Sequence, residues 1–586
     1  MTSIRNLKSI FNLLNFLWYE IGSKRQRQLT WLLVFMILAS VAEMISIGLV
    51  VPFIAVLTTP ANLLDHPLML WLMPYFHISS YAQAASLITC LFIVVVFISA
   101  VIRVILLWLV ARLSFAIGAD FSFSIYQKTL YQPYKIHSSR NSSAVVNAIL
   151  VKVTSTINGT VIPAMNVISI LITLIMILAL LFMLNPMVTT AIFVFFSFVY
   201  CSIIWTTKKQ LLENGSRISS ESNRVTQCLQ EGLGGIRDIL INGIQEYYCR
   251  LYKTANDPLC RAQANNIFLS GYPRFLVEFL AILIIAIFTY SYSLSNRDFS
   301  EILPTLGAIT FSAQRLLPML QQLYGAWSSI LGNQPSALEI KKLLSQATSI
   351  KQNDVDKNLL EFQREISLNN IDFHYESEGN KILEKINIRI KKGERVGIIG
   401  KTGCGKSTLM DIIMGLLEPT FGEIKVDGVK LSAQNLRSWQ DKIAHVPQSI
   451  YLSDATIAEN IAFGVSKEKI DFEKIKSVAK HAKISMEIEM WPNKYQTIVG
   501  ERGVRLSGGQ RQRIGIARAL YKDAEIITLD EATSALDEGT ESEVMLAINK
   551  LSKNITIIII AHRLSTIKDC TQIVDLGTVK CGIPPI

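Results

Sequence analysis

The sequence has little charge for its length. Only 18% of its 586 residues are charged, whereas an average soluble domain carries about 25%. Half of the residues are apolar, and the mean hydropathy is +0.35. The eight cysteines form no C-x-x-C pair, so neither a zinc site nor a disulfide framework is indicated. These shortages exclude a disordered or collagen-like chain and an ordinary soluble enzyme.

The net charge of +11 is concentrated in the first part of the chain. Residues 1–340 contain 22 Lys and Arg against 14 Asp and Glu, while the remainder contains 35 against 32. The positive excess therefore lies in the more apolar part. This distribution favours a membrane as its partner and not a nucleic acid.

Long apolar runs dominate this first part. About 20 apolar residues are needed to cross a bilayer. Six runs predict an all-α, six-helix transmembrane domain over 30–340, and they cover 30–56, 83–111, 161–184, 187–206, 275–292 and 302–332. The preceding residues 1–29 show no cleavable signal peptide and predict an interfacial helix that lies along the membrane surface.

The basic residues predict the orientation of these spans. Segments 21–29, 112–160 and 207–274 are rich in Lys and Arg, whereas 57–82 contains neither. Basic loops tend to remain in the cytoplasm. We therefore predict a multi-pass protein of the inner (plasma) membrane with both termini and the C-terminal domain in the cytoplasm.

Five charged residues lie within the predicted spans or at an edge of one, namely Glu43, Arg103, Arg274, Glu278 and Arg315. Such residues are costly in a membrane and are functional candidates. Two interpretations are open. Either Glu43 and an arginine neutralise each other, or the arginines line a polar cavity for an anionic substrate, because a guanidinium matches the geometry of phosphate.

Residues 341–358 are polar and predict a linker, and 359–586 show the alternating short strands and helices of an α/β P-loop domain. A G-x-x-x-x-G-K-[ST] motif lies there between an apolar strand and a helix. Such a loop surrounds phosphates with backbone N–H groups. Lys406 would neutralise the β- and γ-phosphates, and Ser407 would bind Mg²⁺. The predicted nucleotide-binding residues of this loop are Gly400, Thr402, Gly403, Cys404, Gly405, Lys406, Ser407 and Thr408.

An apolar strand within 524–537 ends in two carboxylates. Asp530 suits Mg²⁺ coordination, directly or through water. Glu531 suits polarisation of an attacking water as a general base, because hydrolysis needs a carboxylate beside the γ-phosphate. The position of this pair downstream of a P-loop makes it a predicted ATPase site.

A second phosphate-binding segment, "RLSGGQRQR" at 505–513, lies between these two motifs. Its two glycines precede a basic helix, whose N-terminus would attract phosphate. One γ-phosphate does not need two such sites in the same chain. We therefore infer that the second site serves a nucleotide bound by another copy of the chain, which predicts a homodimer.

The order and spacing of these motifs resemble the nucleotide-binding domain of ABC transporters. The resemblance includes "LSGGQ" at 506–510, "TLDEATSALD" at 528–537 and "IIAHRLSTI" at 559–567. It implies ATP and Mg²⁺ as cofactors and an ATPase coupled to transport. It also implies that Tyr375 stacks on adenine, that Gln448 contacts the Mg²⁺ held by Ser407 and Asp530, and that His562 contacts the γ-phosphate.

The same resemblance assigns residues to the interface between two copies. Ser507, Gly508, Gly509 and Gln510 would close on the ATP of the partner, and Asp537 would cross the interface. Helices near 131–143 and within 229–239 would transmit this closure to the membrane. After Val574 the sequence "DLGTVKCGIPPI" departs from the usual pattern and predicts a shortened C-terminal tail.

Six spans followed by one ATPase domain resemble an ABC exporter half-transporter. Segments such as "VAEMISIGLVVPFIAVL" (41–57) and "YPRFLVEFLAILI" (272–284) resemble bacterial flippases of lipid-linked oligosaccharides. This narrower resemblance implies that membrane lipids surround the chain and that its substrate is a polyprenyl-pyrophosphate-linked oligosaccharide moved outward. The arginines among the in-span charges named above would meet its pyrophosphate, and Glu43 falls at a matching place.

Three other functions compete with this prediction. A multidrug, lipid A or peptide exporter has the same architecture. An ATP-gated channel or regulator could use the ATPase only as a switch, although such proteins can lose the catalytic carboxylate that Glu531 supplies here. A soluble ABC ATPase that acts on nucleic acid is excluded by the six apolar runs.

Overall fold

The computed structural model contains two compact units. The first comprises Met1–Leu130 and Asn141–Ala347, and the second comprises Tyr131–Arg140 and Thr348–Ile586. The structure describes residues 2–49, 53, 81–184, 186–293, 299–346, 360–375, 381–532, 537–551, 554–561 and 567–577. Residues 57–80 of the predicted outer segment 57–82 and residues 347–358 of the predicted linker lie outside these ranges.

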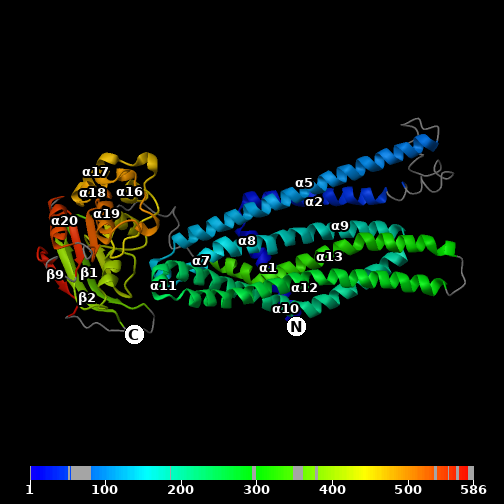
Figure 1. The fold of residues 1–586 in the computed structure, drawn as a ribbon, viewed down its shortest axis with the longest axis horizontal. Coiled ribbons are helices and arrows are strands. Elements are labelled where there is room, and N and C mark those ends of the chain that lie inside the picture. The colour runs from blue at the N-terminus through cyan, green and yellow to red at the C-terminus, as the bar shows by residue number, and fades with distance from the viewer. Residues whose placement is uncertain are drawn as a thin grey trace. The chain divides into compact units, whose positions relative to one another are not determined.

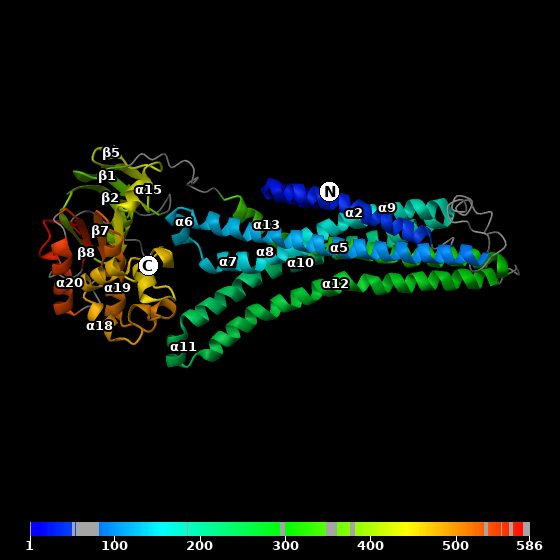
Figure 2. The same cartoon turned by 90° about the horizontal axis from the view of Figure 1, so that it is seen from above.

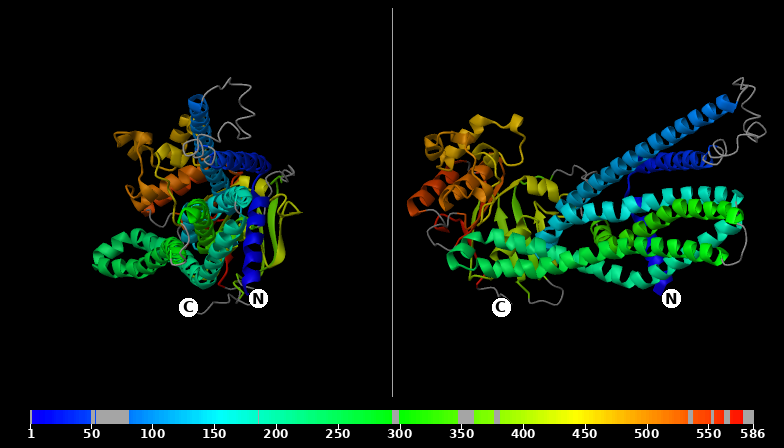
Figure 3. Two further views of the ribbon diagram at one scale, coloured as in Figure 1. Left: turned by 90° about the vertical axis from the view of Figure 1, so that its right-hand side faces the viewer. Right: turned by 45° about the vertical axis from the view of Figure 1, so that its right-hand side comes forward.

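The first unit is entirely helical in the described residues (Figures 1 and 3). Its long helices follow the apolar runs because a backbone in lipid must satisfy its own hydrogen bonds. They are α1 (Thr2–Glu20), α2 (Ser23–Gly48), α5 (Tyr81–Leu130), α9 (Ile162–Leu184), α10 (Pro186–Gly234), α12 (Gln245–Ser293) and α13 (Phe299–Leu344). Helix α5 packs along α2, while α10 packs along α12 and α13.

Within the described ranges, five helices are long and apolar enough to cross a membrane. They correspond to the first five predicted spans. The sixth predicted span lies in α13, where the side chains of 299–313 are outside the description. The predicted fold class, a polytopic helical domain followed by an α/β nucleotide-binding domain, is confirmed.

Several of the long helices continue well beyond the apolar runs that they contain. Helix α12 contains Pro258 and Pro273 and curves in Figure 2, as expected where proline interrupts the hydrogen-bond ladder. Helices α10 and α12 are joined by the short helix α11 (Ile236–Asn242). Four short elements precede α9, namely α7 (Ser142–Asn147), α8 (Val153–Thr156) and two π-helical turns at Ala148–Lys152 and Ile157–Val161.

A largely buried polar cluster joins α7, the first π-helical turn, α10 and α13. It consists of Asn147, Lys152, Ser219, Asn223 and Glu339. The Lys152 ammonium donates to Glu339 and, at 3.1 Å, to the Ser219 hydroxyl. The Lys152 side chain is 2% exposed, and a π-helical turn ends at this residue. A buried ammonium is tolerated only where it is paired and hydrogen-bonded, so this cluster fixes how α10 and α13 pack against the turn.

We expect Lys152→Met to destabilise the first unit by about 2–3 kcal/mol, because it leaves a partly buried Glu339 carboxylate without its cation. The loss should appear as a lower melting temperature of the detergent-purified protein. Adding Glu339→Gln should restore part of it. Lys209→Met removes a solvent-exposed pair with Glu213 and is the matched control, with an expected change within about 0.5 kcal/mol. Equal losses in Lys152→Met and Lys209→Met would contradict this account.

The second unit contains two sheets. The antiparallel sheet has the order β2-β1-β4-β5 and the parallel sheet has the order β6-β7-β8-β3-β9. The antiparallel strands are β1 (Glu365–Phe373), β2 (Leu383–Lys391), β4 (Phe421–Val426) and β5 (Val429–Lys430). The parallel strands are β3 (Arg395–Ile399), β6 (Ile443–Val446), β7 (Ile526–Asp530), β8 (Thr556–Ile560) and β9 (Gln572–Asp575).

The parallel sheet forms the core of this unit. Every residue of its strand β8 is buried, which is typical of a strand covered on both faces. The helices of this unit are α6 (Tyr134–Ser139), α14 (Lys406–Ile413), α15 (Leu436–Asp441), α16 (Ile457–Ile461), α17 (Phe472–His481), α18 (Ser485–Met490), α19 (Gly508–Tyr521) and α20 (Glu538–Leu551).

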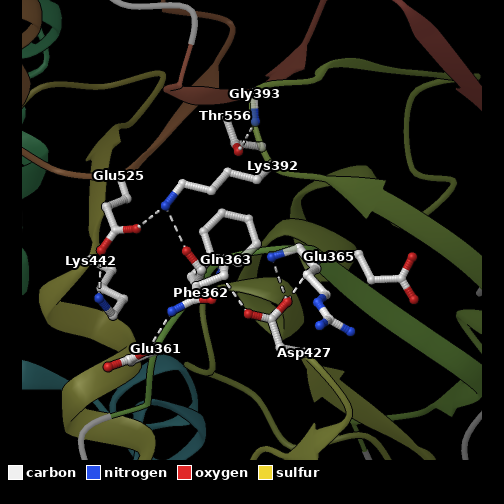
Figure 4. A network of polar contacts seen from close by, with 11 residues as sticks. Glu361, Phe362, Gln363, Glu365, Lys392, Gly393, Asp427, Lys442, Glu525 and Thr556 are labelled. Carbon is white, nitrogen blue, oxygen red and sulfur yellow. Dashed lines mark hydrogen bonds and ion pairs between the residues drawn. The ribbon is translucent and has the colours of Figure 1, made fainter.

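Charged residues tie the start of the antiparallel sheet to the parallel sheet (Figure 4). The Lys392 ammonium donates to the Phe362 carbonyl at 2.6 Å and to Glu525 at 2.8 Å, and Lys442 also pairs with Glu525. Burial disfavours the Glu525 charge, but the two lysines outweigh it and the pKa of Glu525 is lowered. The Asp427 carboxylate accepts three successive backbone N–H groups at 363–365. These contacts hold the two sheets in the arrangement on which the site depends.

Candidate functional site

The P-loop follows β3 and leads into α14. Gly400 (φ +149°) and Gly405 (φ +89°) both adopt conformations that favour glycine. A Cβ at Gly400 would lie 2.6 Å from the Cys404 sulfur, and one at Gly405 would lie 2.9 Å from Ile382 and Leu383. The motif therefore needs glycine at these two positions, because a Cβ atom would come too close to neighbouring atoms of the loop and its surroundings.

Lys406 is buried inside this loop. Its ammonium donates to the carbonyl oxygens of Gly400 at 2.9 Å and Lys401 at 3.1 Å. The side chain thus folds back across the loop whose backbone N–H groups would face phosphates. Ser407 is exposed at the first turn of α14, while Thr408 is buried. This arrangement places a cation and a hydroxyl at a helix N-terminus, where an anion is favoured.

Two of the three predicted catalytic side chains, Gln448 and Glu531, meet in the structure, and the third is His562. The Gln448 amide donates to the Glu531 carboxylate at 2.7 Å. Gln448 follows β6, and Glu531 follows β7, its neighbour in the parallel sheet. Glu531 has a φ of +47°, and its backbone N–H donates to the Ile560 carbonyl at 3.0 Å. The backbone turns sharply here, directly after Asp530 and at the carboxyl ends of the strands, where ligands bind in open α/β sheets.

The sequence analysis missed a third carboxylate, Asp411. Burial raises the pKa of Asp411 to about 6, and the charge of Asp530 contributes to the increase. Asp411 lies on α14 four residues after Ser407, so both occupy the same face of that helix. This helical spacing was the signal available in the sequence.

Tyr375 lies just after β1, beside the P-loop helix. Its ring stands edge-on to Phe373 at a centroid distance of 5.0 Å, and its hydroxyl is 3.4 Å from the Thr408 hydroxyl. The side chain is 40% exposed, which leaves part of the ring accessible.

Tyr134 of α6 lies in the segment 131–143 that is predicted to transmit closure, and it belongs to the second unit, like Tyr375. Burial raises the pKa of Tyr134, and Asp411 and Tyr375 add to the increase.

The signature segment forms a separate helix N-terminus. Ser507 caps α19: its hydroxyl accepts from the Gln510 backbone N–H at 3.1 Å, and the Gln510 side chain accepts from the Ser507 N–H at 2.9 Å. The Gln510 amide also donates to Glu487 at 2.9 Å. Gly508 and Gly509 occupy the first turn. This reciprocal capping preorganises a second phosphate-binding helix terminus.

Of the two remaining predicted site residues, Asp537 is described by the structure and His562 is not. Asp537 lies at the start of α20, where its carboxylate accepts from the Thr540 N–H at 2.9 Å, and this bond lowers the pKa of Asp537. In this chain Asp537 therefore has a local role in addition to any role at an interface. His562 lies outside the described residues, and its contact with the γ-phosphate stays a prediction.

The predicted Mg²⁺ ligands fit a hard cation. Ser407, Asp530 and Gln448 supply a hydroxyl, a carboxylate and an amide oxygen, which Mg²⁺ prefers together with substrate phosphates. The Gln448 amide nitrogen is occupied by Glu531, so its oxygen remains the acceptor. No group of three His, Cys, Asp or Glu side chains forms a protein-only metal cage in the described part of the chain.

Two of the in-span arginines are paired with carboxylates. Arg103 contacts Glu43 at 3.5 Å, and Arg274 contacts Glu278 at 2.9 Å. Arg315 lies in α13, but its side chain is outside the description. The pairing supports the interpretation that these charges neutralise each other. Contact of any of them with a substrate stays a prediction.

The fold and the site together define a membrane-embedded P-loop protein with a signature helix. Residues 383–534 match the family model of the ABC transporter, and residues 29–316 match that of the ABC transporter transmembrane region. These matches cover most of the chain, which therefore belongs to the ABC transporters. It has the fold of an ABC exporter. A bacterial Atm1-family ABC exporter with ATP bound has a TM-score of 0.77 and 20% identity, with 95% of each chain covered.

Several curated relatives are similar over part of their length. An ATP-dependent lipid A-core flippase of Alkalilimnicola ehrlichii is 33% identical, with 64% of each chain covered. The corresponding flippase of Escherichia coli K12 is 31% identical, with 63% of each chain covered. The heterocyst differentiation ATP-binding protein HepA of Nostoc sp. is 34% identical, with 63% of this chain and 60% of that protein covered. The chain thus spans less than two thirds of these relatives. The flippases among them are named for lipid A-core, so the narrower resemblance to lipid-linked oligosaccharide flippases stays a prediction.

Proposed function

We propose that the chain is an ATP-hydrolysing exporter that works as a homodimer and moves a phosphate-bearing glycolipid from the cytoplasmic side of the inner membrane outward. The contact between Gln448 and Glu531 beside the P-loop carries this proposal. It orients the carboxylate that we assign as the general base for ATP hydrolysis. ATP hydrolysis would drive a conformational change in the membrane helices of the same chain.

The proposed mechanism assigns each described group one task. Lys406 and the P-loop backbone hold the phosphates, and Tyr375 lies beside the adenine. Ser407, Asp530 and Gln448 would hold Mg²⁺, which would neutralise charge that develops on the phosphates. Gln448 orients Glu531, which accepts a proton from the attacking water. The signature helix of the second copy covers the nucleotide, and hydrolysis separates the copies, so that ATP binding biases one membrane conformation.

Two glycolipid classes are candidates for the substrate. The membrane segments quoted above resemble flippases of polyprenyl-pyrophosphate-linked oligosaccharides. The relatives named lipid A-core flippases favour lipid A. Both classes carry phosphate groups in the polar part of the lipid, so one guanidinium chemistry would serve both. An ATP-gated channel has no such supporting observation.

Leaflet transfer in liposomes tests this proposal. The purified chain would be reconstituted with a fluorescent lipid-linked oligosaccharide or fluorescent lipid A, with a panel of drugs as competitors and Glu531→Gln as the inactive control. We expect ATP-dependent transfer of one of the two glycolipids and little competition by the drugs. Transfer of neither lipid, or ionic current in a bilayer recording, would contradict the proposal.

A pair of variants separates the two roles of Arg103. We expect Arg103→Gln to reduce leaflet transfer about tenfold, as the loss of one charge-assisted hydrogen bond to phosphate would. The double variant with Glu43→Gln removes both charges, so neither is left unpaired. We expect transfer to remain low in it, because the substrate contact is still missing. Recovery of transfer in the double variant would show that the pair is only structural.

A further inference from the structure

A hollow lies on one face of α5, where its apolar run ends. It has a volume of about 530 Å³ and is lined by Trp108, Ala111, Arg112, Phe115 and Ala116. Residues spaced three and four apart lie on the same face of a helix, which accounts for this set. The two alanines leave space between the larger side chains. Trp108 and Phe115 are both more than half exposed.

Arg112 and Trp108 face this hollow as neighbours. The guanidinium carbon of Arg112 lies 5.7 Å from the centre of the Trp108 ring, within the range of a cation–π contact. Across the described ranges, neither the Arg112 guanidinium nor the Trp108 indole N–H has a hydrogen bond or carboxylate partner. Two donors that suit an oxyanion are thus left without a protein acceptor.

Three arginines within or close to the predicted spans differ from Arg112 in this respect. Arg25 binds Asp120 at 2.8 Å, and Arg103 and Arg274 each contact a glutamate. The sequence analysis singled out the latter two and not Arg112. Among the described residues, Arg112 is therefore a charge without a carboxylate partner, whereas the in-span arginines with described side chains are already neutralised.

The position of the hollow suits a lipid headgroup. The predicted second span, 83–111, ends immediately before Arg112, at the side of the basic loops. Tryptophan is enriched at the boundary between the hydrocarbon and the headgroups. An acyl chain would meet apolar side chains toward the centre of the span, while a phosphate would lie level with the guanidinium.

We propose that this hollow binds the phosphate of a membrane lipid in the leaflet adjoining the basic loops. Arg112 would bind the phosphate oxygens as a fork, the Trp108 indole N–H would donate to the same group, and Phe115 would contact the lipid's apolar part. The unpaired charge at the membrane boundary favours a lipid over a second copy of this chain. The inference goes beyond the transport reaction, because it requires neither ATP hydrolysis nor a particular substrate.

Binding to the full chain in an uncharged sugar detergent tests the proposal. The probes are dioleoyl phosphatidic acid and dioleoyl glycerol, which share their acyl chains but differ by the phosphate. We expect phosphatidic acid to bind more tightly than the glyceride. Arg112→Gln should weaken phosphatidic acid binding about tenfold and leave glyceride binding unchanged. Trp108→Phe, which removes only the indole N–H donor, should have a smaller effect. Arg261→Gln removes an exposed arginine of α12 and is the control, with binding like that of the parent chain.

Equal binding of phosphatidic acid by the parent chain and Arg112→Gln would overturn the proposal. So would equal binding of the two probes by the parent chain. A change in oligomer mass in Arg112→Gln with unchanged lipid binding would assign the hollow to a second copy of the chain. These measurements are made without ATP, so they remain informative even if the proposed transport function fails.

Discussion

Glu531→Gln is expected to slow ATP hydrolysis by at least about a hundredfold while ATP binding is retained. A general base contributes about 10²–10⁴-fold to such a reaction, and the amide cannot accept the proton of the attacking water. The substitution keeps the size of the side chain and allows its contact with Gln448 to re-form. Phosphate release from purified protein measures the loss, and a fluorescent nucleotide measures binding.

The control for this variant is Glu418→Gln, which neutralises an exposed carboxylate of the same unit and should leave turnover unchanged. Gln448→Ala tests the orienting role. We expect turnover to fall less than in Glu531→Gln, because the base remains but is no longer held. Full turnover in Glu531→Gln would refute the assignment of the base and, with it, the proposed mechanism.

Lys406→Met is expected to weaken ATP binding about 10- to 100-fold and to reduce turnover with it. The ammonium is the cation that crosses the P-loop, and charge-assisted hydrogen bonds to phosphate contribute about 1.5–3 kcal/mol each. Methionine fills a similar volume without charge, so the loop keeps its packing. Titration of the protein with a fluorescent ATP analogue measures the affinity.

Lys401→Met is the matched control, because Lys401 belongs to the same loop but its side chain is exposed. Its affinity for ATP should stay within about twofold of the parent chain. The two predictions can be told apart, because Lys406→Met should weaken ATP binding whereas Glu531→Gln should slow ATP hydrolysis. Unchanged ATP affinity in Lys406→Met would show that the phosphates bind elsewhere.

The candidate nucleotide site was largely predictable because its motifs are local. A P-loop depends on glycines at fixed spacings, and the structure shows why: Gly400 and Gly405 have no room for a Cβ. The signature helix is likewise specified by a capping box within four residues. Asp411 was also open to prediction through its helical spacing from Ser407 but went unrecognised. The orientation of the spans and the interface between copies stay predictions.

The pairing of charges was predictable only where the partners share a helix. Arg274 and Glu278 are four residues apart in α12, a spacing at which helical side chains meet. Arg103 and Glu43 are 60 residues apart and lie on different helices. The two glutamates therefore differ in how their partners could be found, although both had been recognised as charges in apolar runs.

The sequence by itself determined the class of the protein. Apolar runs long enough to cross a bilayer specify a helical membrane unit, and motifs of fixed spacing specify an ABC nucleotide-binding domain, because both depend on short stretches of backbone. The tertiary structure alone decided which side chains meet. It joined Gln448 to Glu531 across 83 residues, buried Lys152 against Glu339 and left Arg112 without a described acid. Such contacts depend on how helices and strands distant in the sequence pack together, which no local pattern contains.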